Sequence, residues 1–386
     1  MIFSIFKRGG KKKDKEGSRE KQGSQVRADV VEEKPSPSYV KTSTVIAFTS
    51  SKGGAGKSLL CTGAALIASA AGERVMVVDM DVTNMSTTTI MLWSLGMGNV
   101  RLREELYRYL SDANVFSFVK LLRDAPKILT SIEENPRLRI TRDLRDYSPL
   151  MIRRDHHRLY IPVPGREAVG EPLIYIGDIL FVPASPLSIM VVERERFYEN
   201  IPEELMDSAK ASVNVLRRIA AELGVTRVFI DLPPTDRLKQ YKGQFKWVNT
   251  VAENSDASFL VTEYIGSHQG GIDYSGELVG FYSTFKGFDS IISRKGVGGI
   301  IVNKVSLSDI ENFNSTWLYQ TLSRVFPSIS KLGKIYPVVS DPVWARYKQT
   351  EKLQIHPILI TIRGAGASLA NILYSEGLIN DISWLS

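Results

Sequence analysis

A glycine-rich loop at residues 52–58 carries the clearest chemical signal in this sequence. It reads Lys-Gly-Gly-Ala-Gly-Lys-Ser. The apolar, β-branched run at 44–49 before it predicts a strand, and the run at 59–68 after it predicts a buried helix. Glycines between a strand and a helix let backbone N–H groups surround phosphate oxygens at the positive end of the helix. The predicted phosphate-binding residues are Gly53, Gly54, Ala55, Gly56, Lys57, Ser58 and Leu59.

The lysines and the serine of this loop indicate what it binds. In a loop of this kind Lys57 reaches the β- and γ-phosphates of ATP, and the Ser58 hydroxyl ligates Mg²⁺. ATP and Mg²⁺ are therefore the predicted cofactors. The loop differs from the ordinary pattern in having Ser51 where that pattern has glycine, and in carrying a second lysine, Lys52, five residues before Lys57.

Acidic residues follow two further predicted strands. The apolar run 74–78 ends in Asp79-Met80-Asp81, and the run 227–230 ends in Asp231, followed by Leu-Pro-Pro. Because side chains alternate along a strand, Asp79 and Asp81 can point the same way at the carboxyl end of the sheet. Ligands bind at that edge in open parallel sheets, so these carboxylates are predicted to meet the nucleotide.

Two lysines flanking the glycines are typical of the ParA/MinD family of deviant-Walker-A P-loop ATPases, and the chain resembles this family. The resemblance implies that Lys52 crosses a dimer interface to the nucleotide of the other subunit. It also implies that Asp79 supports the magnesium shell, that Asp81 positions the attacking water, and that Asp231 holds a magnesium-bound water. The catalytic residues expected on this basis are Lys52, Lys57 and Asp81, and the expected metal-site residues are Ser58, Asp79 and Asp231.

Three later segments resemble the family in the same order along the chain. Residues 259–264 form a predicted strand ending in Glu263-Tyr264, with Gly270-Gly271 beyond it, a stretch more typical of ParA than of MinD. The strand 298–304 resembles the adenine-reading element, which places the Asn303 amide on the adenine edge. Segments 334–337 and 341–343 resemble the part that closes over the base, and this adds Pro337 to the nucleotide-binding residues.

Composition indicates a cytoplasmic protein. The chain has 386 residues, 43% of them hydrophobic, and one cysteine, Cys61. A single cysteine excludes a disulfide framework and the family branches that need paired cysteines for iron–sulfur clusters or zinc. No apolar run approaches the ~18 residues that a transmembrane helix needs. At the N-terminus the basic residues follow the apolar ones, so a signal peptide is not expected.

The first 43 residues are predicted to be a disordered basic tail, separate from the ATPase domain at 44–386. Residues 1–44 carry eleven Lys or Arg against six Asp or Glu. Such composition favours disorder. The apolar tip 1–6 followed by basic residues to 13 suits an anionic membrane surface, so peripheral contact through Met1–Lys13 is one interpretation. A solvated tail or non-specific nucleic-acid contact is the alternative.

Residues 95–172 are predicted to be an insertion within the domain. Leucines at 102, 106 and 110, and apolar residues at 118, 121 and 122, have helical spacing and predict two amphipathic helices. Six arginines between 139 and 158 either contact phosphates or an acidic partner, or form a mixed solvated surface with the aspartates among them. His156-His157 has no partner with ligand spacing, so a loop pair is preferred over a metal site.

Strands alternate with helices from residue 44 to the C-terminus. This alternation predicts an α/β fold with a doubly wound, mostly parallel sheet, as in P-loop NTPases. The chain is expected to rejoin the core after the insertion in a strand at 174–183, followed by a helix around 206–223.

The function implied is an ATP-driven homodimeric switch ATPase. A ParA-like role in partitioning plasmid or chromosome DNA by non-specific DNA binding is the first hypothesis, with basic pairs such as Arg294-Lys295 as phosphate contacts. A MinD-like role in positioning a division site or surface assembly at the membrane is the second, and a hydrolysis-poor scaffold is the third. A ParB- or MinE-like activator is the expected partner, and the protein is expected at the nucleoid or at the membrane periphery.

Overall fold

The computed structural model describes residues 43–96, 108, 110–112, 115–147, 149–152, 158–159, 174–175, 179–187, 205–235, 244–264, 287–340 and 364–383. All of them belong to one compact unit, Lys41–Ser386. The predictions made for the tail and its tip, for Leu102 and Leu106, for His156-His157, for Gly270-Gly271 and for residues 341–343 lie outside the described residues.

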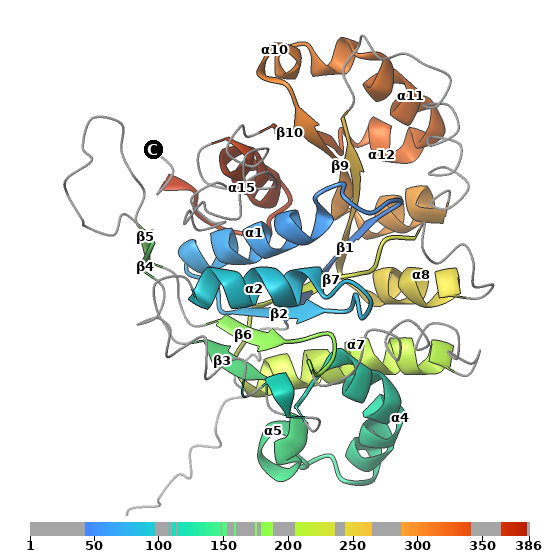
Figure 1. Ribbon diagram of the computed structural model, residues 1–386. Coiled ribbons are helices and arrows are strands. Elements are labelled where there is room, and N and C mark those ends of the chain that lie inside the picture. Colours follow the sequence, from blue (N-terminus) through green and yellow to red (C-terminus); the bar gives the residue numbers. More distant parts are fainter. Residues whose placement is uncertain are drawn as a thin grey trace, which may run out of the picture. The chain divides into compact units, whose positions relative to one another are not determined.

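An eight-stranded sheet forms the centre of this unit (Figure 1), in the order β10-β9-β8-β1-β7-β2-β6-β3. Seven strands are parallel to one another, and β3 at the edge runs antiparallel to β6. The predicted doubly wound, mostly parallel sheet is therefore confirmed. The strands are β1 (Thr44–Ser50), β2 (Val75–Asp79), β3 (Leu150–Ile152), β6 (Ile179–Val182), β7 (Arg227–Asp231), β8 (Ala257–Glu263), β9 (Gly298–Val305) and β10 (Ile335–Val339).

The single strand predicted at 174–183 is wrong in its extent. Only β6 joins the main sheet, whereas β5 (Ile174–Tyr175) pairs antiparallel with β4 (Arg158–Leu159) in a separate two-stranded sheet. The intervening sequence contains Gly177-Asp178. Glycine and aspartate both weaken a strand and favour a turn, so they divide the apolar run into two short strands.

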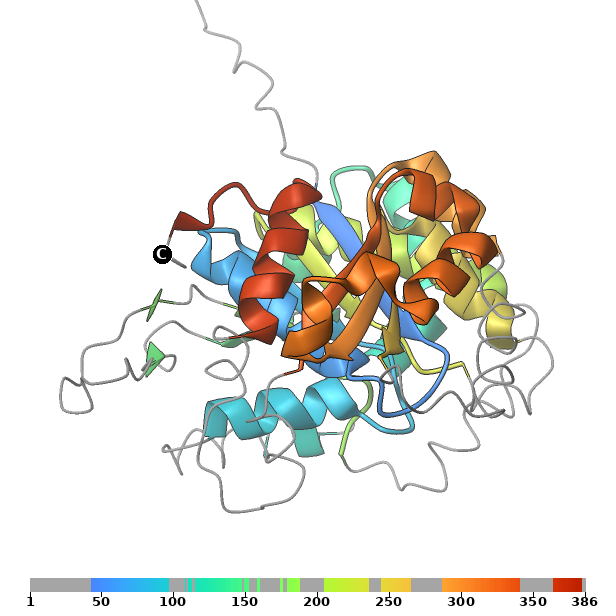
Figure 2. The ribbon, with the colours of Figure 1, turned by 90° about the horizontal axis from the view of Figure 1, so that it is seen from above.

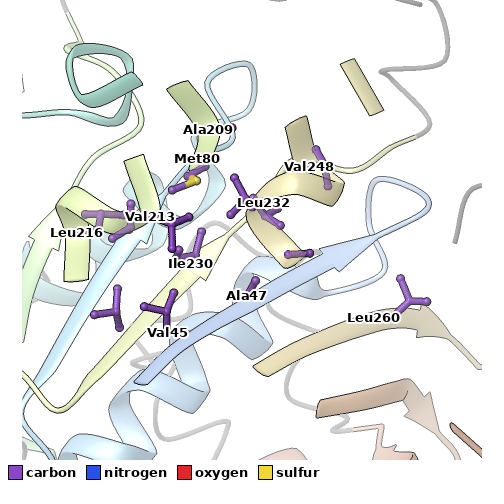
Figure 3. Close-up of a cluster of buried hydrophobic side chains, with 14 of the residues drawn as sticks. Val45, Ala47, Met80, Ala209, Val213, Leu216, Ile230, Leu232, Val248 and Leu260 are labelled. Carbon is purple, nitrogen blue, oxygen red and sulfur yellow. The ribbon is translucent and has the colours of Figure 1, made fainter. Parts of the chain in front are cut away.

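Strand side chains alternate between two cores, one on each face of the sheet. Val45 and Ala47 of β1 and Ile230 of β7 lie in the first core with Val213 and Leu216 of α7 (Figure 3). This core is covered by α4 (Phe118–Glu134), α7 (Leu205–Glu222), α8 (Gln244–Asn254), α11 (Trp317–Val325) and α12 (Pro327–Lys331).

The intervening residues of the same strands, such as Ile46, Phe48 and Phe229, lie in the second core. That core is covered by α1 (Lys57–Ala70), α2 (Ser86–Gly96) and α15 (Ala365–Ser375). Figure 2 shows α15 alongside α1. Because Asp79 and Asp231 follow the alternation of the second core, both carboxylates face the side of the sheet that carries α1 and α2.

Part of the predicted insertion belongs to the core. A helix predicted from Phe118, Leu121 and Leu122 is confirmed as α4, which buries these three residues against α7. Ser117 caps the N-terminus of α4 by accepting a hydrogen bond from the Lys120 amide. Beyond it come α5 (Ile140–Asp143), the 3-10 helix η1 (Arg145–Tyr147) and β3. The segment therefore supplies both a helix and an edge strand to the domain.

The remaining described elements lie after β9. They are α10 (Leu307–Ile310) and the 3-10 helix η4 (Phe313–Ser315), which precede α11. Among the described residues no helix has the length and apolar character needed to cross a membrane.

Candidate nucleotide-binding site

The glycine-rich loop joins the carboxyl end of β1 to the N-terminus of α1. Gly54 and Gly56 have φ values of 86° and 87°, in the left-handed region where a side chain is strained. The N-cap of α1 is Gly56 itself, so no side chain caps this end of the helix. The first N–H groups of a helix lack intrahelical acceptors, and here they are left for an anionic ligand such as a phosphate.

A buried ion pair lies at the base of the loop. Lys57, the first residue of α1, donates a hydrogen bond from Nζ to Oδ1 of Asp231 at the end of β7. The two side chains are 5% and 0% exposed. Lys57 Nζ also lies 3.2 Å from the hydroxyl of Ser58. The structure therefore brings together the predicted phosphate-binding lysine and two of the predicted metal-site residues.

Two threonines at the start of α2 hold the strand-end aspartates. Thr87 donates its hydroxyl to Oδ2 of Asp231 at 2.9 Å. Thr88 donates both its backbone N–H (2.7 Å) and its hydroxyl (2.8 Å) to Oδ2 of Asp79. Asp79 thus caps the beginning of α2 from a neighbouring strand, and both carboxylates connect the sheet to this helix.

The third aspartate, Asp81, is held by the loop that follows β2. Asn84 donates its backbone N–H to Oδ1 of Asp81 at 3.1 Å and its side-chain amide to Oδ2 at 2.8 Å. The Asp81 backbone N–H in turn donates to Asp79 at 3.0 Å. Asp81 is 2% exposed, so its carboxylate is fixed and largely shielded from bulk water.

The site crowds three buried carboxyl groups, Asp79, Asp81 and Asp231, around one lysine. Burial, together with the charges of Asp231 and Asp81, raises the pKa of Asp79 to about 8. Burial also raises the pKa of Asp81, although Lys57 opposes the shift. Burial lowers the pKa of Lys57, but the carboxylates, Asp231 first, outweigh it and hold that pKa above its ordinary value. One lysine faces three carboxylates, and such a site favours a further cation.

These residues fit Mg²⁺ together with a nucleoside triphosphate. Among the described residues no group of three or more His, Cys, Asp or Glu side chains is arranged as a metal cage. Mg²⁺ seldom uses such a cage, because it keeps several waters and binds through one or two carboxylates plus substrate phosphates. Ser58 and Asp231 would hold the ion, with Asp79 as a supporting carboxylate.

Asn303 connects β9 to the glycine-rich loop. Its amide donates to the carbonyl of Ala55 at 2.9 Å, and its Oδ1 accepts the backbone N–H of Lys304 at 2.9 Å. Asn303 is 2% exposed. Its contact with the adenine stays a prediction. Pro337 lies half-buried in β10, paired in register with Val302 of β9.

Lys52 and Lys304 lie on either side of one carboxylate. Glu263, the last residue of β8, has Oε2 at 3.7 Å from Lys52 Nζ and Oε1 at 2.5 Å from Lys304 Nζ. Lys304 also donates to the carbonyl of Gly54 at 3.0 Å. The lysine expected to reach a second subunit is therefore paired within its own chain here.

Lys295, one of the basic residues suggested for DNA contact, lies against the end of a helix. Lys295 donates from Nζ to the carbonyls of Ala252, at 2.6 Å, and Ser255 at the end of α8. Burial lowers the pKa of Lys295 to about 8. The Lys295 ammonium group therefore caps the C-terminus of α8 in this structure, and its contact with DNA phosphates stays a prediction.

Several residues of the site had not been selected from the sequence. Asn84, Thr87 and Thr88 orient the three aspartates, and Lys304 contacts the loop. The run of threonine, asparagine and serine residues after Asp81 could have indicated these hydrogen-bond donors. Such residues are common in loops, so the run alone does not identify them. In the arginine-rich stretch between residues 139 and 158, Arg142 forms an ion pair with the adjacent Asp143. This contact agrees with the mixed solvated surface that was one of the two interpretations of the stretch.

Comparison with known proteins assigns a family. A model of the CobQ/CobB/MinD/ParA nucleotide binding domain matches residues 46–336. No curated protein matches the chain.

Three solved structures illustrate the similarity. The MinC:MinD cell division complex of Aquifex aeolicus is 13% identical, with 88% of this chain and 98% of that chain covered and a TM-score of 0.47. McdA of Cyanothece in complex with ATP is 12% identical, with 89% and 98% covered and a TM-score of 0.46. A plasmid partition protein of Borrelia burgdorferi is 13% identical, with 87% and 99% covered and a TM-score of 0.43.

Proposed function

Since the chain belongs to the CobQ/CobB/MinD/ParA nucleotide-binding domain family, we propose that it is an ATP-dependent, dimerising switch ATPase. The observation that carries this proposal is the buried Lys57–Asp231 pair below an uncapped helix N-terminus. A buried lysine held by a carboxylate is positioned to exchange that carboxylate for phosphate oxygens. ATP is therefore the proposed substrate, and ADP and phosphate are the products.

Each residue of the cluster has a proposed task. Lys57 binds the β- and γ-phosphates, and the N–H groups at the start of α1 bind the phosphate oxygens around it. Mg²⁺, when bound, neutralises charge that develops on the phosphates. Asp81, fixed by Asn84, orients the attacking water and accepts its proton. Burial raises the pKa of Asp81, which makes its carboxylate a better proton acceptor than an ordinary exposed one.

The proposed dimer depends on ATP because Lys52 of each subunit contacts the nucleotide of the other. In the proposed dimer Lys52 leaves Glu263 and reaches the phosphates of the partner subunit, so two nucleotides lie between the subunits. Closure then creates a composite surface that exists only with ATP. An activator of the ParB or MinE type stimulates hydrolysis, after which the subunits separate.

Partition of DNA is the first proposed role for this switch. The chain has a sequence pI of about 9.2, and Glu263-Tyr264 resembles the ParA pattern. Contact would be with phosphates and not with bases, so binding should be independent of sequence and should weaken with salt. Such a protein would be associated with the nucleoid.

A peripheral membrane role is the second candidate, and one sequence feature favours it. Met1–Phe6 is largely apolar, and basic residues continue to Lys13. Insertion of the tip with lysines at the head groups contributes about 1 kcal/mol per basic residue, so a dimer with two tips binds more firmly than a monomer.

Sedimentation with DNA and with anionic liposomes separates the two roles. The assay uses the full chain and a form beginning at Thr42, each with and without ATP. ATP-dependent sedimentation with DNA by both forms supports partition, whereas sedimentation with liposomes by the full chain alone supports the membrane role. ATP turnover is measured in parallel. If the protein binds ATP and dimerises without turning it over, it is a hydrolysis-poor scaffold and not an ATPase.

A further inference from the structure

Glu263 lies between two lysines, Lys52 and Lys304, next to the glycine-rich loop. Its Oε2 is 3.7 Å from Lys52 Nζ at the start of the loop, and its Oε1 is 2.5 Å from Lys304 Nζ. The Glu263 side chain is 26% exposed, and each lysine side chain is 30% exposed. One carboxylate is therefore shared by two half-buried cations next to the phosphate-binding loop.

The backbone at Lys304 holds one side of this arrangement in place. Lys304 has φ 66°, a left-handed conformation that costs a non-glycine residue about 1 kcal/mol or more. Lys304 lies within β9, and its ammonium group contacts both Glu263 and the Gly54 carbonyl. A strained residue that makes two specific polar contacts keeps the Glu263 carboxylate in position, with its other oxygen toward Lys52.

The Lys52 contact is weak enough to be exchanged. An ion pair that is partly exposed contributes about 0.2–1 kcal/mol, because water screens both charges. A triphosphate carries more negative charge than one carboxylate and competes well for the same ammonium group. Lys52 can therefore leave Glu263 when phosphate oxygens become available, but the exchange has a cost.

We propose that Glu263 holds Lys52 on its own subunit and thereby sets the protein concentration at which the ATP-bound dimer forms. This inference rests on the proposed function, in which Lys52 reaches the nucleotide of the partner. Glu263 acts through Lys52 and is a positioning residue, with no direct contact to phosphate. Lys304 keeps the carboxylate in place throughout the exchange.

Glu263→Gln tests this inference, because it removes the charge and keeps the size of the side chain. Dimerisation is measured by sedimentation velocity with Mg²⁺ and saturating adenylyl imidodiphosphate. Losing one contact of this strength in each subunit should lower the dimer dissociation constant about 2- to 30-fold. Glu133→Gln removes one charge from the exposed face of α4 and should leave the dissociation constant unchanged.

A second measurement follows the Lys52 amine directly, without nucleotide. Brief acetylation of the monomer followed by mass spectrometry should label Lys52 about 1.5- to 5-fold faster in Glu263→Gln than in wild type. Glu133→Gln changes an exposed residue of α4 and should leave the labelling of Lys52 at the wild-type rate. Thermal unfolding confirms that each variant is folded.

The outcomes are distinct. Equal dissociation constants for a wild-type dimer and Glu263→Gln overturn the inference, as does unchanged labelling of Lys52. If the wild-type protein binds the nucleotide but stays monomeric, the dimerisation in the proposed function is wrong. The labelling of Lys52 then decides by itself whether Glu263 holds Lys52.

Discussion

Asp79 and Asp231 are register partners at the last positions of β2 and β7, yet their carboxylates have different contacts. Asp231 accepts hydrogen bonds from Lys57 and Thr87. Asp79 accepts two from Thr88 and one from the Asp81 backbone. The same strand position therefore supplies one carboxylate, Asp231, that joins the phosphate-binding lysine to the start of α2, and another, Asp79, that contacts α2 and the loop after β2.

Lys57→Met should lower both ATP affinity and stability. Loss of the charged hydrogen bonds to phosphate should weaken ATP binding at least about 100-fold, as measured by calorimetry. Asp231 is then buried without its cation, and the free energy of unfolding should fall by about 3–5 kcal/mol. The double variant Lys57→Met/Asp231→Asn should recover much of the stability but not the binding. Unchanged ATP affinity in Lys57→Met would contradict the loop assignment.

Asp81→Ala should leave ATP binding intact, stop hydrolysis and accumulate the ATP-bound dimer, because the attacking water loses its orienting carboxylate. Asn84→Ala removes the side-chain hydrogen bond to Asp81 and leaves the carboxylate in place. It should therefore lower kcat about tenfold with little change in KM. Steady-state phosphate release measures both variants. Wild-type turnover in Asp81→Ala would show that the catalytic residue lies elsewhere.

Gly298→Ala should destabilise the fold because strands β8 and β9 approach closely at this position. Gly298 has φ 107°, and a Cβ there would lie 2.2 Å from the Ser258 carbonyl oxygen. The free energy of unfolding in urea should fall by about 2–4 kcal/mol. Gly72→Ala is the matched control, since its φ is 86° but its Cβ would meet nothing within 4 Å. It should cost only about 1 kcal/mol.

Lys295→Met should affect stability in a pH-dependent way. Burial lowers the pKa of Lys295 to about 8 in the folded protein, below its ordinary 10.5. Between about pH 8 and pH 10.5 the unfolded chain therefore binds more protons at Lys295 than the folded protein does. The free energy of unfolding of the wild type should increase as the pH rises through this range. Relative to Lys295→Met, the wild type should therefore be more stable at pH 10 than at pH 7. Urea unfolding of both proteins tests the sign, and an equal difference at the two pH values would argue against a lowered pKa.

The sequence by itself determined the type of fold and the chemistry of the loop. Alternating side chains in the runs at 44–49, 74–78 and 227–230 predicted strands, and glycines before Lys57 predicted a turn into a helix. These signals are local, since they depend on steric preferences within a few residues. They fixed which residues stand at strand ends, and therefore which carboxylates are available to a ligand.

Only the tertiary structure decided what each of those residues contacts. Residues 75–79 and 227–231 are far apart in the chain, and their pairing places Asp79 beside Asp231. The packing of α1 and α2 on the same face of the sheet then gives Lys57 to one carboxylate and Thr88 to the other. Lys295 likewise became a helix cap because α8 ends beside it. Such contacts depend on which elements are neighbours in space, and no local preference of the sequence encodes that.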